Sequence, residues 1–184
     1  MEEVKGYKAF NKDATNRYGK PFEEGMTYRV DGDITFGNTG NGYHMCTSLC
    51  DVFRYVDAVE DDVLVARVTG RGKFQKMDDE YYGYYDMYSF EEITIDEFMT
   101  REEVIEVMLN SSAYQVIKFL VTFKLNEKEK IRFFSKFRSD DNVMKNLLYY
   151  QYDCKSVFEN SDNVDQVRLV MKYGQNNSKR RERK

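Results

Sequence analysis

Residues 77–99 read MDDEYYGYYDMYSFEEITIDEFM, and this stretch separates two halves of the chain that differ in hydrophobic periodicity. It holds eight Asp or Glu residues and no Lys or Arg, a net charge of −8 against −4 for the whole chain. Apolar residues before it form short strand-like runs, and apolar residues after it recur at helical spacing. The pattern predicts an α+β fold. A small N-terminal mixed or antiparallel sheet with one or two short helices is followed by a C-terminal bundle of about five short helices.

The N-terminal half contains several short apolar runs separated by turn residues. Asp31-Gly32 is a type I′ hairpin signal, and we expect it to join two of these strands. Ser48 or Thr47 can cap a short helix that reaches about Tyr55. The sequence Thr69-Gly-Arg-Gly72 is expected to turn the chain after a buried strand. The predicted strands are Val4–Phe10, Met26–Val30, Asp33–Phe36, Tyr43–Cys46, Val63–Val68 and Ile93–Ile95.

The C-terminal half carries repeated helix-start signals. Thr100 with Glu103, and Asn126 with Glu129, have capping-box spacing, while Ser111 or Ser112, Asp140 or Asp141, and Ser161 or Asp162 are further N-cap candidates. The predicted helices are Val104–Leu109, Ala113–Leu125, Ile131–Phe137, Val143–Tyr152 and Val164–Tyr173. The predicted organisation is therefore an α+β domain at 1–76, an acidic tyrosine-rich connector with a strand at 77–99, a helical domain at 100–174 and a basic disordered tail at 175–184.

The acidic connector is the first candidate functional site. Tyrosines supply flat contact area at low entropic cost, and a dense row of carboxylates complements a basic groove of the kind that holds nucleic acid. The alternative is a solvated acidic loop whose tyrosines pack on the domain. The candidate partner-binding residues are Asp78, Asp79, Glu80, Tyr81, Tyr82, Tyr84, Tyr85, Asp86, Glu91 and Glu92.

The single histidine and the three cysteines define a second, catalytic possibility. His44 could act as the general base of a metal-independent ribonuclease, with Lys8 and Arg54 as cations for the developing phosphate charge. The alternative is that His44 is structural and the basic residues belong to an ordinary surface. Cys46 and Cys50 follow His44 as H-x-C-x3-C, but no second Cys/His pair completes a zinc site, so we expect buried thiols, no metal and no cofactor.

Composition limits the compartment and the class of protein. No window approaches the roughly 18 apolar residues of a membrane span, and the first ten residues, MEEVKGYKAF, are polar and acidic rather than signal-like. An odd cysteine count favours a reducing interior. We expect a globular protein of the bacterial host cytoplasm, without membrane contact, as a monomer or weak dimer.

Part of the N-terminal half resembles a small domain of unknown function found in phage and prophage proteins. The matching stretches are Gly6–Asn11, Gly25–Tyr28, Gly42–Cys46, Asp51–Tyr55 and Val65–Gly70. The resemblance implies no activity, and so no functional residue. The order of strand, hairpin, Gly-Tyr-His, helix and strand is also similar to the core of ADP-ribosyltransferases, but no Gln/Glu-x-Glu setting follows.

The whole chain, with its phage-type block, helical module and acidic patch, resembles in kind the anti-CRISPR proteins directed at type II systems. This resemblance implies a phage or mobile-element inhibitor that binds a Cas9-type nuclease, its guide RNA or both, with guide-RNA cleavage as an added option. A small enzyme of the ribonuclease or ADP-ribosyltransferase type acting on a host target, and a structural or accessory phage protein, remain alternatives.

Overall fold

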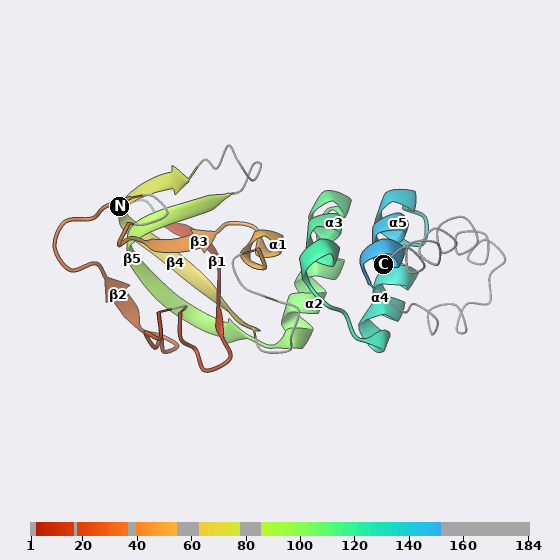
Figure 1. The fold of residues 1–184 in the computed structure, drawn as a ribbon, viewed down its shortest axis with the longest axis horizontal. Coiled ribbons are helices and arrows are strands. Elements are labelled where there is room, and N and C mark those ends of the chain that lie inside the picture. Colours follow the sequence, from red (N-terminus) through yellow and green to blue (C-terminus); the bar gives the residue numbers. More distant parts are fainter. Residues whose placement is uncertain (1–2, 17, 37–39, 55–62, 78–85, 152–184) are drawn as a thin grey trace, which may run out of the picture. The chain divides into compact units, whose positions relative to one another are not determined.

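The computed structural model describes residues 3–16, 18–36, 40–54, 63–77 and 86–151, and it divides the chain into two compact units, Met1–Val107 and Met108–Lys184 (Figure 1). An antiparallel sheet comes first and helices follow, so the predicted α+β class is confirmed. The helix predicted at 164–173 and the tail at 175–184 lie outside the described residues. The predicted boundary near residue 99 falls just before helix α2 (Arg101–Leu109), while the first compact unit extends to Val107.

The described residues of the sheet unit form five antiparallel strands, and the pairings of four of them form a closed circuit. The strands are β1 (Val4–Asn11), β2 (Thr27–Arg29), β3 (Tyr43–Cys46), β4 (Val63–Met77) and β5 (Met87–Met99). β4 pairs with β1 and β5, β3 joins β5 to β1, and β2 pairs with β5 alone. The short helix α1 (Leu49–Val52) packs against β1 and β3.

Two glycines explain how the strands come so close. A Cβ added to Gly6 would lie 2.3 Å from the carbonyl oxygen of Cys46, where β1 meets β3. A Cβ on Gly70 would lie 2.5 Å from the ring of Phe90, which covers this glycine across the β4–β5 pair. The residues between the strands form one apolar core cluster: Phe10, Phe22, Met45, Ala66, Val68, Phe90, Ile93 and Ile95. Close contacts at these glycines, with a backbone carbonyl at Gly6 and an aromatic ring at Gly70, therefore hold neighbouring strands together.

Two strand predictions are wrong. Asp31-Gly32 does not join a hairpin, because β2 pairs with the distant β5 and residues 33–36 form no strand. The Thr69–Gly72 stretch does not end its strand either. β4 runs through it to Met77, with a register shift between Arg71 and Phe74 and a positive φ of 79° at Gly72. The glycines create a bulge, which bends a strand without ending it.

The described helix starts confirm the caps predicted for them, and the cap predicted at Ser161 or Asp162 lies outside the described residues. α3 (Ala113–Thr122) and α4 (Glu127–Phe137) begin with reciprocal capping boxes at Ser112/Gln115 and Asn126/Glu129, and α5 (Asp141–Tyr150) is capped by Asp140. Thr100 and Glu103 form the same arrangement at the start of α2. α3 and α4 both pack against α5. The core of the unit includes stacked rings from α3 and α4: Phe119, Phe123, Phe133 and Phe137.

Candidate functional site

The far end of the β4–β5 hairpin is where the predicted contact segment attaches. The two strands stay paired up to Met77 opposite Met87, so the strand ends fix the positions at which residues 78–86 leave and re-enter the sheet. Residues 87–99 of the predicted connector are β5, an integral strand of the sheet. We define the hairpin end as Phe74, Lys76, Asp86, Tyr88 and Phe90. Asp78, Asp79, Glu80, Tyr81, Tyr82, Tyr84 and Tyr85 lie outside the described residues.

An aromatic stack stiffens the hairpin end. The ring of Phe74 lies 5.2 Å from that of Phe90 and 6.2 Å from that of Tyr88, and the Tyr88 and Phe90 rings are 6.0 Å apart. Phe90 is fully buried, whereas Phe74 keeps 39% of its surface exposed. An exposed ring with rigid rings beneath it offers contact area that costs little entropy to immobilise. Phe74 is not among the partner-binding residues predicted from the sequence, where nothing distinguishes it from a buried ring.

Asp86 is held by a cation from the opposite strand. Lys76 Nζ lies 3.1 Å from Asp86 Oδ1 and 5.8 Å from the centre of the Tyr88 ring. Both charged side chains are about half exposed, so the pair contributes little stability. It nevertheless leaves Asp86 with a neutralising partner from within the chain, so a binding partner would have to compete with Lys76 for it.

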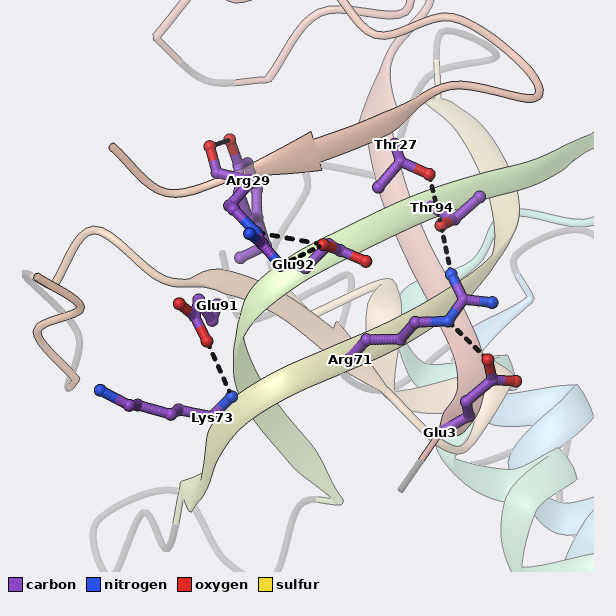
Figure 2. A network of polar contacts seen from close by, with 9 residues as sticks. Glu3, Thr27, Arg29, Arg71, Lys73, Glu91, Glu92 and Thr94 are labelled. Atoms are coloured by element: carbon purple, nitrogen blue, oxygen red, sulfur yellow. Dashed lines mark hydrogen bonds and ion pairs between the residues drawn. The ribbon is translucent and has the colours of Figure 1, made fainter. Parts of the chain in front are cut away.

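Glu91 and Glu92 are also engaged within the sheet (Figure 2). A Glu92 carboxylate oxygen lies 3.1 Å from Arg29 Nη2, and only 18% of the Glu92 side chain is exposed. The Glu91 carboxylate accepts a hydrogen bond from the Lys73 backbone N–H at 3.1 Å. These contacts tie β2 to β5 and span the bulge in β4. Neither carboxylate is presented to a partner as an isolated anion.

The Arg71 side chain makes two hydrogen bonds near these carboxylates. Its Nε donates to Glu3 at 2.6 Å and its Nη1 donates to Thr94 at 2.7 Å (Figure 2). The hydrogen bond and charge of Arg71 lower the pKa of Glu3, and the bond to Glu3 raises the pKa of Arg71. This pairing fixes the start of β1 to β4 and β5.

The two remaining carboxylates of β5 also have partners within the sheet. Asp96 accepts a hydrogen bond from the Thr69 hydroxyl at 2.7 Å, and Glu97 pairs with Arg67. All five described carboxylates of the acidic stretch therefore have a donor or cation from this chain.

The three candidate catalytic residues come from three elements. Lys8, on β1, donates from Nζ to the backbone carbonyl of His44 at 2.7 Å, so these two residues are brought together. His44 Nε2 is buried, and its neighbour across β5 is Ser89, which is fully buried. Arg54 is exposed, just after α1. A general base must contact the hydroxyl whose proton it removes, so the burial of Nε2 does not support this role for His44.

The two described cysteines, Cys46 and Cys50, are buried, as expected, and Cys154 lies outside the described residues. Within the described ranges, no group of three or more His, Cys, Asp or Glu side chains is placed to hold a metal ion. No helix in the described part of the chain is long and apolar enough to cross a bilayer.

The sheet unit is the part of the chain that matches a known protein family. A family model for a domain of unknown function, DUF7666, matches residues 4–106, which include every described strand and the first two thirds of α2. The chain belongs to this family of uncharacterised domains. No curated protein and no solved structure matches the chain. The glycines that allow close strand contact, Gly6 and Gly70, both fall within the matched region.

Proposed function

We propose that this protein is a binding protein whose contact surface is the end of the β4–β5 hairpin, directed at a positively charged partner. The observation that carries the proposal is an exposed aromatic ring near the end of a hairpin whose connecting sequence is acidic and rich in tyrosine. Phe74 keeps 39% of its surface exposed, and residues 78–86 contain four tyrosines and four carboxylates, among which Asp86 pairs with Lys76. Acidic and aromatic groups together suit a basic surface that also offers flat apolar area.

The partner that we propose in particular is a Cas9-type nuclease with its guide RNA, which would make the protein an inhibitor carried by a phage or other mobile element. Such nucleases hold nucleic acid in basic channels and read DNA through arginines, and carboxylates can pair with those arginines through charge-assisted hydrogen bonds. The support is chemical complementarity and the resemblance in kind described above.

Cleavage of the guide RNA by His44, with Lys8 and Arg54, is a second candidate. It is less well supported because His44 Nε2 is buried. Incubating guide RNA with the protein in EDTA, with and without the nuclease, separates the two candidates on a denaturing gel. Binding without cleavage supports the first, and shortened RNA that disappears in a His44→Gln variant supports the second.

The binding test uses the full chain and a purified Cas9-type nuclease, alone and loaded with guide RNA. Calorimetric titration at several salt concentrations should give an affinity that falls as salt rises, because the expected contacts are charged and solvent-accessible. Absence of binding in every combination would overturn the Cas9 proposal. Light scattering of the free protein checks the predicted monomer or weak dimer, and a stable large homo-oligomer would favour a structural role.

A further inference from the structure

Lys20 lies among three aromatic rings on a different part of the sheet unit. Its Nζ is 5.2 Å from the centre of the Tyr43 ring, 5.6 Å from that of Tyr28 and 5.8 Å from that of Phe22. The same nitrogen donates a hydrogen bond to the Tyr43 hydroxyl at 3.0 Å. All three distances are within the range of cation–π attraction, which is about 6 Å. Three aromatic residues of this chain thus contact one ammonium group, and Tyr43 does so through its hydroxyl at the edge of the ring.

The walls of this aromatic cage, Phe22, Tyr28 and Tyr43, are fixed by the fold. Phe22 is buried, with its ring 4.7 Å from that of Tyr28 and 6.3 Å from that of Tyr43, at 90° to the latter. Tyr28 and Tyr43 lie on β2 and β3, and their hydroxyls are oriented by the Glu23 N–H at 2.8 Å and the Arg29 carbonyl at 3.3 Å. The rings therefore do not depend on Lys20 for their arrangement.

The turn that carries Lys20 is held independently of its side chain. The Asn16 carboxamide accepts hydrogen bonds from the backbone N–H groups of Tyr18 and Lys20, both at 3.0 Å. The Asn16 N–H donates to the Lys20 carbonyl at 2.9 Å, and Thr15 forms a bridge with Pro21. Lys20 itself is exposed. Its long side chain can leave the rings while its backbone stays in place.

The chemistry of the cage is poorly matched to a primary ammonium. No carboxylate among the described residues contacts Lys20, and one phenol oxygen accepts only one of its three N–H donors. A primary ammonium is strongly hydrated, whereas a methylated ammonium has fewer or no N–H groups to satisfy and is attracted by ring faces alone. The position of Lys20 shows that the cage can hold an ammonium group, and a methylated ammonium group would fit its chemistry better.

We propose that Phe22, Tyr28 and Tyr43 form a binding site for a methylated ammonium group, such as a methylated lysine side chain of a partner protein, and that Lys20 occupies the site until the ligand displaces it. Lys20 is exposed, so its side chain can leave the site for a ligand without moving its backbone. The site uses none of the residues of the hairpin end, so it stands or falls separately from the proposed partner surface.

The test is an NMR titration of the full chain with tetramethylammonium chloride. Lys20→Ala opens the cage and should bind the probe about tenfold more tightly than the unmodified protein, the effect of removing a competitor worth about 1.4 kcal/mol. Tyr28→Leu in the Lys20→Ala background should abolish that gain. Lys118→Ala is the matched control, because Lys118 Nζ lies 5.4 Å from the single ring of Tyr114 and its removal opens no cage.

A neutral probe of similar shape, tert-butyl alcohol, separates cation recognition from simple apolar contact. Weak binding of the alcohol beside strong binding of tetramethylammonium supports the proposal. Equal binding of both probes, or no gain in Lys20→Ala while circular dichroism shows it folded, would overturn it. If Lys20→Ala loses its fold, Lys20→Met keeps the aliphatic stem without the charge and is titrated in the same way. Loss of the fold in both variants would identify Lys20 as a structural tether and refute the proposal.

Discussion

The contacts that stabilise the sheet unit and those that stabilise the helical unit differ in how far apart their residues lie in the sequence. In the sheet unit, the decisive contacts join residues far apart in the chain, such as Gly6 with Cys46 and Gly70 with Phe90. In the helical unit, each described helix start is fixed by residues two or three positions apart, and Gln151 is a long-range exception. A single added atom should therefore disrupt the sheet, whereas each substitution at a helix start should lower the free energy of unfolding by a smaller amount.

The largest expected effect is in the sheet unit. Gly6→Ala should lower the free energy of unfolding by about 3 kcal/mol, because the new Cβ meets a backbone oxygen that cannot move without separating β1 from β3. Urea denaturation measures this change. Gly25→Ala is the matched control, since its φ of +77° is strained but nothing lies within 4 Å of the new Cβ, and it should cost about 1 kcal/mol. Equal losses would contradict the close-contact explanation.

Gln151 tests whether one distant contact matters as much in the helical unit. Its side chain accepts from the Leu125 N–H at 2.8 Å and donates to the carbonyls of Leu120 and Phe123 at 2.7 and 2.8 Å, all in a buried setting. Gln151→Met keeps the length of the side chain but leaves these backbone groups unsatisfied, so we expect a loss of about 2–3 kcal/mol. A loss below about 0.5 kcal/mol in urea denaturation would show that water replaces the amide.

A local contact should matter less. Asn126→Ala removes the side-chain acceptor for the Glu129 N–H at 3.0 Å and should cost about 1 kcal/mol. Asn126→Asp preserves the acceptor and serves as the control in the same denaturation series. A cost for Asn126→Ala as large as that of Gly6→Ala would remove the distinction between the two units.

The smallest effect concerns the surface pair of Glu3 and Arg71. The pKa of Glu3 is lowered by its bond to Arg71, so the pair's contribution to stability is present at neutral pH and is lost as the pH falls through the folded-state pKa. Glu3→Gln should therefore lower the urea midpoint slightly at pH 7, and the difference from the unmodified protein should shrink in acid. Glu23→Gln provides an exposed control. A difference that grows in acid would have the wrong sign for this pairing.

These contrasts also explain how far the sequence could predict the fold. Capping boxes such as Asn126 with Glu129 were correctly predicted because the partners are three residues apart and their chemistry is specific. The prediction of a hairpin at Asp31-Gly32 is wrong because a turn signal shows where the chain can reverse but not which strands pair. In the structure, β2 pairs with β5. The sequence around Gly70 and Gly72 predicts a turn, whereas the structure has a bulge there, because turns and bulges use the same residues.

The candidate site was predictable only in part. The acidic charge of residues 86–97 is visible in the sequence, but the cations that match it, Arg29, Arg67 and Lys76, lie on other strands and depend on register. The exposure of Phe74 and the rings around Lys20 likewise follow from strand pairing. Composition identified a charged segment, and the three-dimensional structure distinguishes which of its described charges are already paired.

The most direct test of the central claim compares two triple substitutions that remove the same charge. Asp78→Asn, Asp79→Asn and Glu80→Gln neutralise the segment beside the hairpin end, whereas Glu92→Gln, Asp96→Asn and Glu97→Gln neutralise carboxylates with partners in the sheet. Affinity for the guide-loaded Cas9-type nuclease at low salt is measured for both. We expect the first variant to lose at least about tenfold in affinity, or about 1.4 kcal/mol, and the second to change by less than about threefold. Equal losses, or a greater loss in the second variant, would contradict the account.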